Sequence, residues 1–148
     1  MKRFWMLFVL AWLAMGFAGQ ADAGMIEPGL RDYILQGNPD GMTPVIVILG
    51  DRVDTKAIVE SMTASHASLA ERHRVVVTEL QDKAESTQGA VINRILELQK
   101  AGEVSEYTSL WIMNVIGVSA KLSAIEKIAA MPQVETIIYD TEDRKSVV

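Results

Sequence analysis

The most continuous apolar run outside the N-terminus lies at 45–49, where Val-Ile-Val-Ile-Leu follows Pro44 and ends at Gly50-Asp51. Five apolar residues between turn residues are typical of a strand that is buried on both faces. We therefore predict a central β-strand at 45–49, and take it as the first strand of the fold.

Apolar residues recur at helical spacing between Asp54 and Ala101. Asp54 is a candidate N-cap, and Gly102 is the stop signal. One apolar stripe recurs at steps of three, four or seven residues. Few helices in compact domains are this long, so we predict a break between Ser61 and Ser68. The stripe consists of Leu69, Val76, Leu80, Ala84, Thr87, Val91, Ile95 and Leu98.

Alternation returns at 103–112, with Tyr107, Ser109 and Trp111 on one face of a second predicted strand. A third strand at 115–120 completes a hairpin, with a tight turn near Asn114.

A second helix follows the hairpin. Ser123-Ala124-Ile125-Glu126 has the capping-box pattern that opens a helix, and Pro132 ends it. The segment 134–140 is then a fourth strand.

This order of elements predicts an α+β, ferredoxin-like split βαβ fold. It has a four-stranded antiparallel sheet with helices on one face, and a long helical insertion between the first and second strands. The other sheet face is left open. Exposed apolar surface of this kind usually marks a docking site for a partner.

The N-terminus has the features of an export signal. Lys2 and Arg3 precede an apolar run at 4–18, and Ala21-Asp22-Ala23 supplies a cleavage pattern, so residues 1–23 are predicted to be removed. A membrane anchor is the alternative, but the run is shorter than the ~20 residues needed to cross a bilayer. We expect an exported protein, periplasmic or extracellular, with no membrane contact after signal removal.

Three segments remain after cleavage. Residues 24–43 are rich in Gly and Pro and predict a loose arm, 44–140 form the folded domain, and 141–148 form a flexible tail. The cleaved chain has 12 basic and 18 acidic residues, a net charge of −6, which argues against a nucleic-acid partner. It has no cysteine, so a disulfide or a Cys-ligated zinc is excluded.

Catalytic motifs are missing from the sequence. His66 and His73 lie seven residues apart on a helical stretch without a third metal ligand in register. No serine stands in a Gly-x-Ser-x-Gly elbow, and no glycine-rich phosphate loop occurs. We therefore expect a binding protein rather than an enzyme, without cofactor or metal.

Five pieces of the stretch from about Arg74 to Asp140 carry a family likeness when they are taken in order. They are Arg74-Val75-Val76, Ala84-Glu85-Ser86-Thr87-Gln88, Trp111-Ile112-Met113-Asn114, Val118-Ser119-Ala120 and Ile125-Glu126-Lys127-Ile128-Ala129-Ala130-Met131-Pro132-Gln133-Val134. In this combination the stretch resembles the propeptide-inhibitor domain of subtilisin-like serine proteases, most of all the bacillopeptidase F type.

The resemblance implies a partner, a subtilisin-like serine protease that is inhibited or helped to fold. The open sheet face would pack on the protease, acidic residues after the last strand would cap its helix N-termini, and the tail would enter its substrate cleft. The candidate partner-binding residues are Tyr107, Trp111, Asn114, Asp140, Glu142, Asp143, Val147 and Val148.

Two features depart from the short propeptides of this family. The segment between the first two strands is longer, and the sequence has none of the Asp-Thr-Gly, His-Gly-Thr-His or Gly-Thr-Ser-Met-Ala blocks of such a protease, so we expect no protease domain after Val148. The alternatives are therefore the remnant propeptide of an interrupted protease gene, or a domain of the same fold that self-associates through its sheet face. We expect a monomer or a weak dimer. Small-ligand binding or an unrecognised enzyme is the weaker third class.

Overall fold

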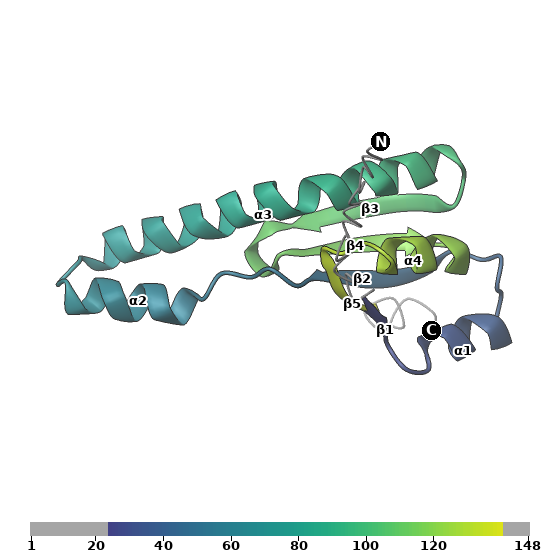
Figure 1. The fold of residues 1–148 in the computed structure, drawn as a ribbon, viewed down its shortest axis with the longest axis horizontal. Helices are drawn as coiled ribbons and strands as arrows, with labels where there is room; N and C mark the ends of the chain where they lie inside the picture. The colour runs from purple at the N-terminus through teal and green to yellow at the C-terminus, as the bar shows by residue number, and fades with distance from the viewer. Residues whose placement is uncertain (1–23, 141–148) are drawn as a thin grey trace, which may run out of the picture.

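A computed structural model describes residues 24–140 and shows an α+β fold, with a five-stranded mixed sheet and four α-helices (Figure 1). A short 3₁₀-helix, η1, joins two of the strands. In chain order the elements are β1 (Met25–Ile26), α1 (Leu30–Gln36), β2 (Thr43–Leu49), α2 (Thr55–Ala64), α3 (Leu69–Lys100), β3 (Val104–Leu110), η1 (Trp111–Met113), β4 (Val115–Ala120), α4 (Leu122–Ala129) and β5 (Val134–Tyr139).

The strands lie in the order β1-β5-β2-β4-β3. The four strands predicted from the sequence are antiparallel neighbours, with β2 between β4 and β5 and with β3 on the outer side of β4. The predicted four-stranded antiparallel sheet is nevertheless wrong in one respect. Met25 and Ile26 pair in parallel with Thr136 and Ile137, so the sheet has five strands and is mixed.

The predicted loose arm at 24–43 is also wrong. The segment contains β1 and α1, and α1 buries Leu30 and Ile34 in the same core as the sheet. The ring of Tyr33 packs edge-on against Tyr139 of β5, with ring centroids 5.1 Å apart. This helix was missed in the sequence because it has only seven residues and because its N-cap is Gly29, whose φ is 93° and which has no side chain to cap the helix.

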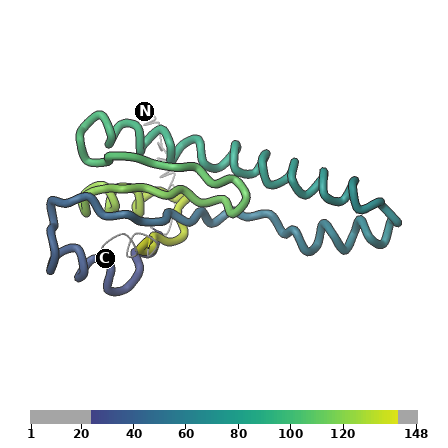
Figure 2. Tube along the Cα trace, turned by 180° about the vertical axis from the view of Figure 1, so that it is seen from behind, coloured from purple at the N-terminus to yellow at the C-terminus, as the bar shows by residue number. Residues whose placement is uncertain are grey.

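The core lies between the sheet and the helices α3 and α4, which cover the same face. Val45, Val47 and Leu49 of β2 point into it, as do Ile116 and Val118 of β4. α3 covers the sheet with its C-terminal half alone, where its five buried residues lie (Figure 2). These are Ala84, Gln88, Val91, Ile95 and Leu98.

The other half of α3 forms a projecting hairpin with α2, which we define as residues 55–83. It stands clear of the sheet, and none of its residues is buried (Figures 1 and 2). The predicted break between Ser61 and Ser68 is confirmed, since α2 ends at Ala64 and α3 begins at Leu69. The predicted N-cap is also confirmed, because the Asp54 carboxylate accepts a hydrogen bond from the Ala57 amide at 3.0 Å.

The turn at the tip of this hairpin is capped on both sides. The amides of His66 and Ala67 donate to the carbonyls of Thr63 and Met62, the pattern of a Schellman motif. Ser68 and Glu71 then form a reciprocal capping box that opens α3. The hydrogen bonds from the Ser68 amide and hydroxyl lower the pKa of Glu71 below its ordinary 4.5.

His66 occupies the left-handed position of the Schellman motif, with φ of 59°. Glycine adopts this conformation without the clash that a Cβ causes. We expect His66→Gly to raise the free energy of unfolding by about 0.5 kcal/mol, after the larger backbone entropy of unfolded glycine is deducted. Urea denaturation measures this. A matched His73→Gly in the second turn of α3 should destabilise the protein instead.

The start of α4 differs from its prediction. The helix begins two residues earlier, with Lys121 instead of Ser123 at the N-cap, and the expected capping box at Ser123 does not form. The Ser123 hydroxyl instead donates to the Glu103 carboxylate at 2.9 Å, and Lys127 donates to the same carboxylate at 2.7 Å. Hydrogen bonds from Lys127 and then Ser123 lower the pKa of Glu103 below its ordinary 4.5.

The hydrogen bonds from Ser123 and Lys127 to the Glu103 carboxylate predict that stability depends on pH. The pKa of Glu103 is lower in the folded protein than in the unfolded one. Its contribution to the free energy of unfolding is therefore complete above about pH 4.5 and is lost as the pH falls through the lowered pKa. We expect Glu103→Gln to lower the melting temperature at pH 7 and to match the wild type in strong acid. Glu106→Gln, in the adjoining strand β3, is the control and should have little effect at either pH.

Candidate docking face

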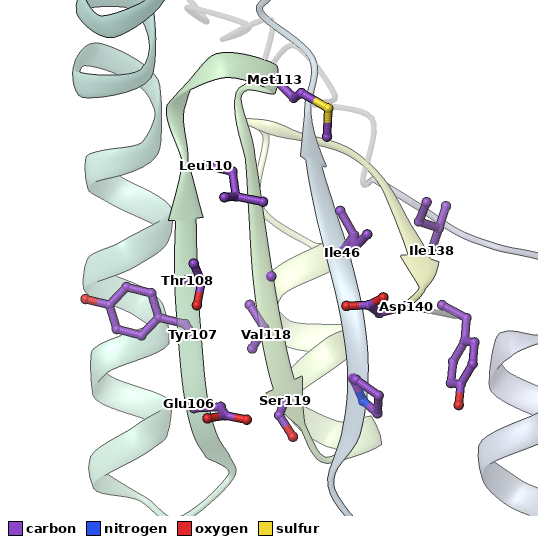
Figure 3. A pocket seen from close by; sticks show the side chains of 13 residues that line it. Ile46, Glu106, Tyr107, Thr108, Leu110, Met113, Val118, Ser119, Ile138 and Asp140 are labelled. Atoms are coloured by element: carbon purple, nitrogen blue, oxygen red, sulfur yellow. The ribbon is translucent and has the colours of Figure 1, made fainter. Parts of the chain in front are cut away.

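The sheet face opposite α3 and α4 has no helix of the described residues over it, and we call it the open face. Alternation along each strand decides which side chains lie on it. In β2, Pro44 and Ile46 alternate with the buried Val45 and Val47. Thr108 of β3 pairs with Gly117 of β4 near the middle of the face (Figure 3).

A shallow hollow runs across this face, and its two ends differ in chemistry (Figure 3). Leu110 and Met113 make one end apolar, and both are exposed. Glu106 and Asp140 supply carboxylates at the other end. Because Gly117 has no side chain, the floor of the hollow there is backbone. The hollow can therefore receive an apolar side chain beside a polar or basic one.

The central strand was predicted to be buried on both faces, and this is wrong. Ile46 and Ile48 of β2 are half-buried, because no helix covers the open face. The sequence gives no sign of the difference, since the run at 45–49 is apolar throughout. Ile46, Thr108 and Ile138 are accordingly the face residues that sequence reasoning missed. Hydrophobic periodicity could not find them without the strand order.

Tyr107 and Trp111 were predicted to share one sheet face, and they do not share it. Tyr107 points from β3 toward the helix side and packs against the core (Figure 3). Trp111 has left the strand, because β3 ends at Leu110 and Trp111 begins η1. It lines a groove beside α3 instead. The interpretation of these two aromatic residues as a joint docking pair is therefore wrong.

Asn114 is placed inside the molecule, so its predicted contact with a partner gives way to a structural role. It is 3% exposed and takes the left-handed conformation, with φ of 51°. Its amide oxygen accepts from Gln88 at 3.0 Å, and its amide nitrogen donates to the Asp51 carbonyl at 2.8 Å and to the Thr87 hydroxyl at 2.9 Å. The tight turn predicted at this residue is confirmed.

Among the predicted binding residues that the structure describes, Asp140 is the one whose side chain lies on the open face (Figure 3). Its backbone amide donates to the Pro44 carbonyl at 3.1 Å, which holds the end of β5 beside β2. The signal sequence at 1–23 and the tail residues Glu142, Asp143, Val147 and Val148 lie outside the described residues.

Within residues 24–140 no three His, Asp or Glu side chains gather where they could hold a metal ion. No helix in this range combines the length and the apolar character needed to span a bilayer. The fold class is α+β, with a mixed sheet that is open on one face. Comparisons with known protein families, with curated proteins and with solved structures gave no match.

Proposed function

We propose that this chain is an exported, non-catalytic protein that binds a subtilisin-like serine protease through its open face, as an inhibitor or folding assistant. The proposal takes strands β2 to β5 with α3 and α4 as a ferredoxin-like split βαβ unit, extended by β1, α1 and the projecting hairpin. The observation that carries it is the open face itself, a hollowed sheet surface with half-buried isoleucines and a carboxylate-bearing end.

The position of Asp140 supports the inhibitory part of this proposal. It is the last described residue and lies on the open face, so the chain leaves the domain at the proposed contact. Eight residues follow it, and a chain of that length extends to at most about 28 Å. Residues 141–148 could then enter the substrate cleft of a protease docked on the sheet.

Thr108→Arg tests the docking face, because it fills the hollow over Gly117 from an exposed position of the edge strand. We expect subtilisin to bind residues 24–148, and the variant to bind at least about tenfold more weakly, since a misplaced charge at an interface costs over 1 kcal/mol. Ala90→Arg, on an exposed turn of α3, is the matched control. Calorimetry measures both, and equal affinities would place the contact elsewhere.

The tail is tested by deleting residues 144–148. If the tail fills the cleft while the open face provides docking, the shortened protein should lose inhibition far more than binding. Residual protease activity and calorimetric affinity separate the two effects. A shortened protein that inhibits as well as residues 24–148 excludes the tail from the cleft. If neither form binds any subtilisin-like protease, the protease-binding proposal gives way to an interaction domain.

A further inference from the structure

The apolar stripe of α3 continues beyond the sheet that it covers. Val77 lies two turns before Ala84, the first buried residue of the stripe, so it occupies the same side of the helix. Leu80 lies one turn from each of them. Both Val77 and Leu80 are half-buried, and at this point α3 has already left the sheet (Figure 1).

A groove lies beside the part of α3 that covers the sheet, and it continues the apolar surface formed by Val77 and Leu80. Ala84 and Glu85 form one wall, and Trp111 of η1 forms the other. Trp111 is 37% exposed and its neighbour Ile112 is 60% exposed. Trp111 and Ile112, together with Val77 and Leu80, make an apolar strip along the base of the projecting hairpin, which we call the α3 strip.

The projecting hairpin has little to stabilise it within one molecule. Short helices in water depend on packing, yet α2 buries no residue and packs mainly against α3 in a two-helix layer. Both ends of its tip turn are nevertheless fully capped. A capped two-helix element whose apolar residues are only half-buried is the form expected of an element that packs against another helix.

The charged residues of the projecting hairpin and of α3 indicate which helix would pack against the α3 strip. The hairpin at 55–83 has four basic and four acidic residues, whereas the chain as a whole has a net charge of −5. Arg74 and Glu85 are exposed and lie eleven residues, about three turns, apart on one side of α3. Neither belongs to a salt bridge among residues 24–140. They stand on either side of Val77 and Leu80, with opposite signs.

We propose that the α3 strip binds a second copy of this chain, in a two-fold symmetric pair with the two α3 helices antiparallel. A two-fold axis passing between residues 79 and 80 places Arg74 of each copy opposite Glu85 of the other. Val77, Leu80 and Trp111 of the two copies then bury one another. The open face lies on the other side of the sheet and stays accessible, so this inference does not depend on the protease proposal.

A pair of valine substitutions tests the apolar part. Sedimentation equilibrium of residues 24–148 should show a monomer–dimer equilibrium in the micromolar range, and Val77→Glu should raise its dissociation constant at least about tenfold. Val75→Glu is the matched control, because Val75 is equally half-buried but lies about 200° around the helix from Val77. Equal weakening by both variants overturns the proposal.

A charge exchange tests the geometry. Arg74→Glu and Glu85→Arg should each raise the dissociation constant about fivefold, because each makes two repulsive contacts per dimer. The double variant restores both contacts with signs exchanged and should return to within about twofold of the wild type. Melting temperatures identify any variant that fails to fold. A protein that is monomeric throughout, or a double variant weaker than either single one, overturns the proposal.

Discussion

Replacing Ile34 with alanine is expected to lower the free energy of unfolding by about 3 kcal/mol, although the sequence marks its surroundings as a loose arm. Ile34 is 2% exposed and belongs to the main core cluster. Its truncation removes buried methyl groups and leaves a cavity between α1 and the sheet. Urea denaturation measures the loss, and the melting temperature should fall by about 10 °C.

Leu35→Ala is the matched control for this prediction. Leu35 is the next residue of the same helix, similar in size and 51% exposed, so its replacement should cost well under 1 kcal/mol. The ratio of the two effects reports whether α1 is docked in solution. Equal and small effects would mean that α1 does not pack on the core, and that the domain begins near Thr43.

Asn114→Ala is expected to destabilise the protein by about 3 kcal/mol, through hydrogen bonds and not through lost apolar contact. The change leaves the buried Gln88 amide and the part-buried Asp51 carbonyl without their partner. It also places a Cβ-bearing residue without local hydrogen bonds at a φ of 51°. Chemical denaturation measures the total.

Two further variants separate the backbone contribution to that loss of stability from the hydrogen-bond contribution. Asn114→Gly relieves the backbone but still removes the hydrogen bonds, so it should recover about 1 kcal/mol of the alanine loss. Asn114→Asp keeps an acceptor for Gln88 and loses the donor to Asp51, and it also buries a carboxylate. If Asn114→Ala costs less than about 1 kcal/mol, the network at the β3–β4 turn is not a source of stability.

The regular elements were predicted well where local chemistry is strong. The Asp54 cap, the break before Ser68 and the turn at Asn114 each depend on residues within one turn of the chain. The capping box at Ser123 failed for a different reason. Its motif is correct, but Glu103, twenty residues away, takes the serine hydroxyl. Local motifs lose to a charged partner that tertiary structure brings within hydrogen-bonding distance.

The candidate site was harder to predict, because it is a property of one sheet face. Tyr107 and Trp111 match a strand alternation until Leu110, where the strand ends and Trp111 turns toward α3. Ile46 looks like a core residue in an unbroken apolar run, and it is half-buried because no helix within residues 24–140 covers that side of the sheet. A period of two assigns residues to opposite faces but does not say which face is covered.

The sequence by itself determined the order of the four main strands and two main helix regions along the chain, since each depends on hydrophobic periodicity and on caps within a few residues. Tertiary structure decided the rest. It added β1 and α1, because Met25, Ile26 and Ile34 find their partners more than a hundred residues away or across the core. It also determined how far α3 covers the sheet, because the length of a helix does not specify where the sheet beneath it ends.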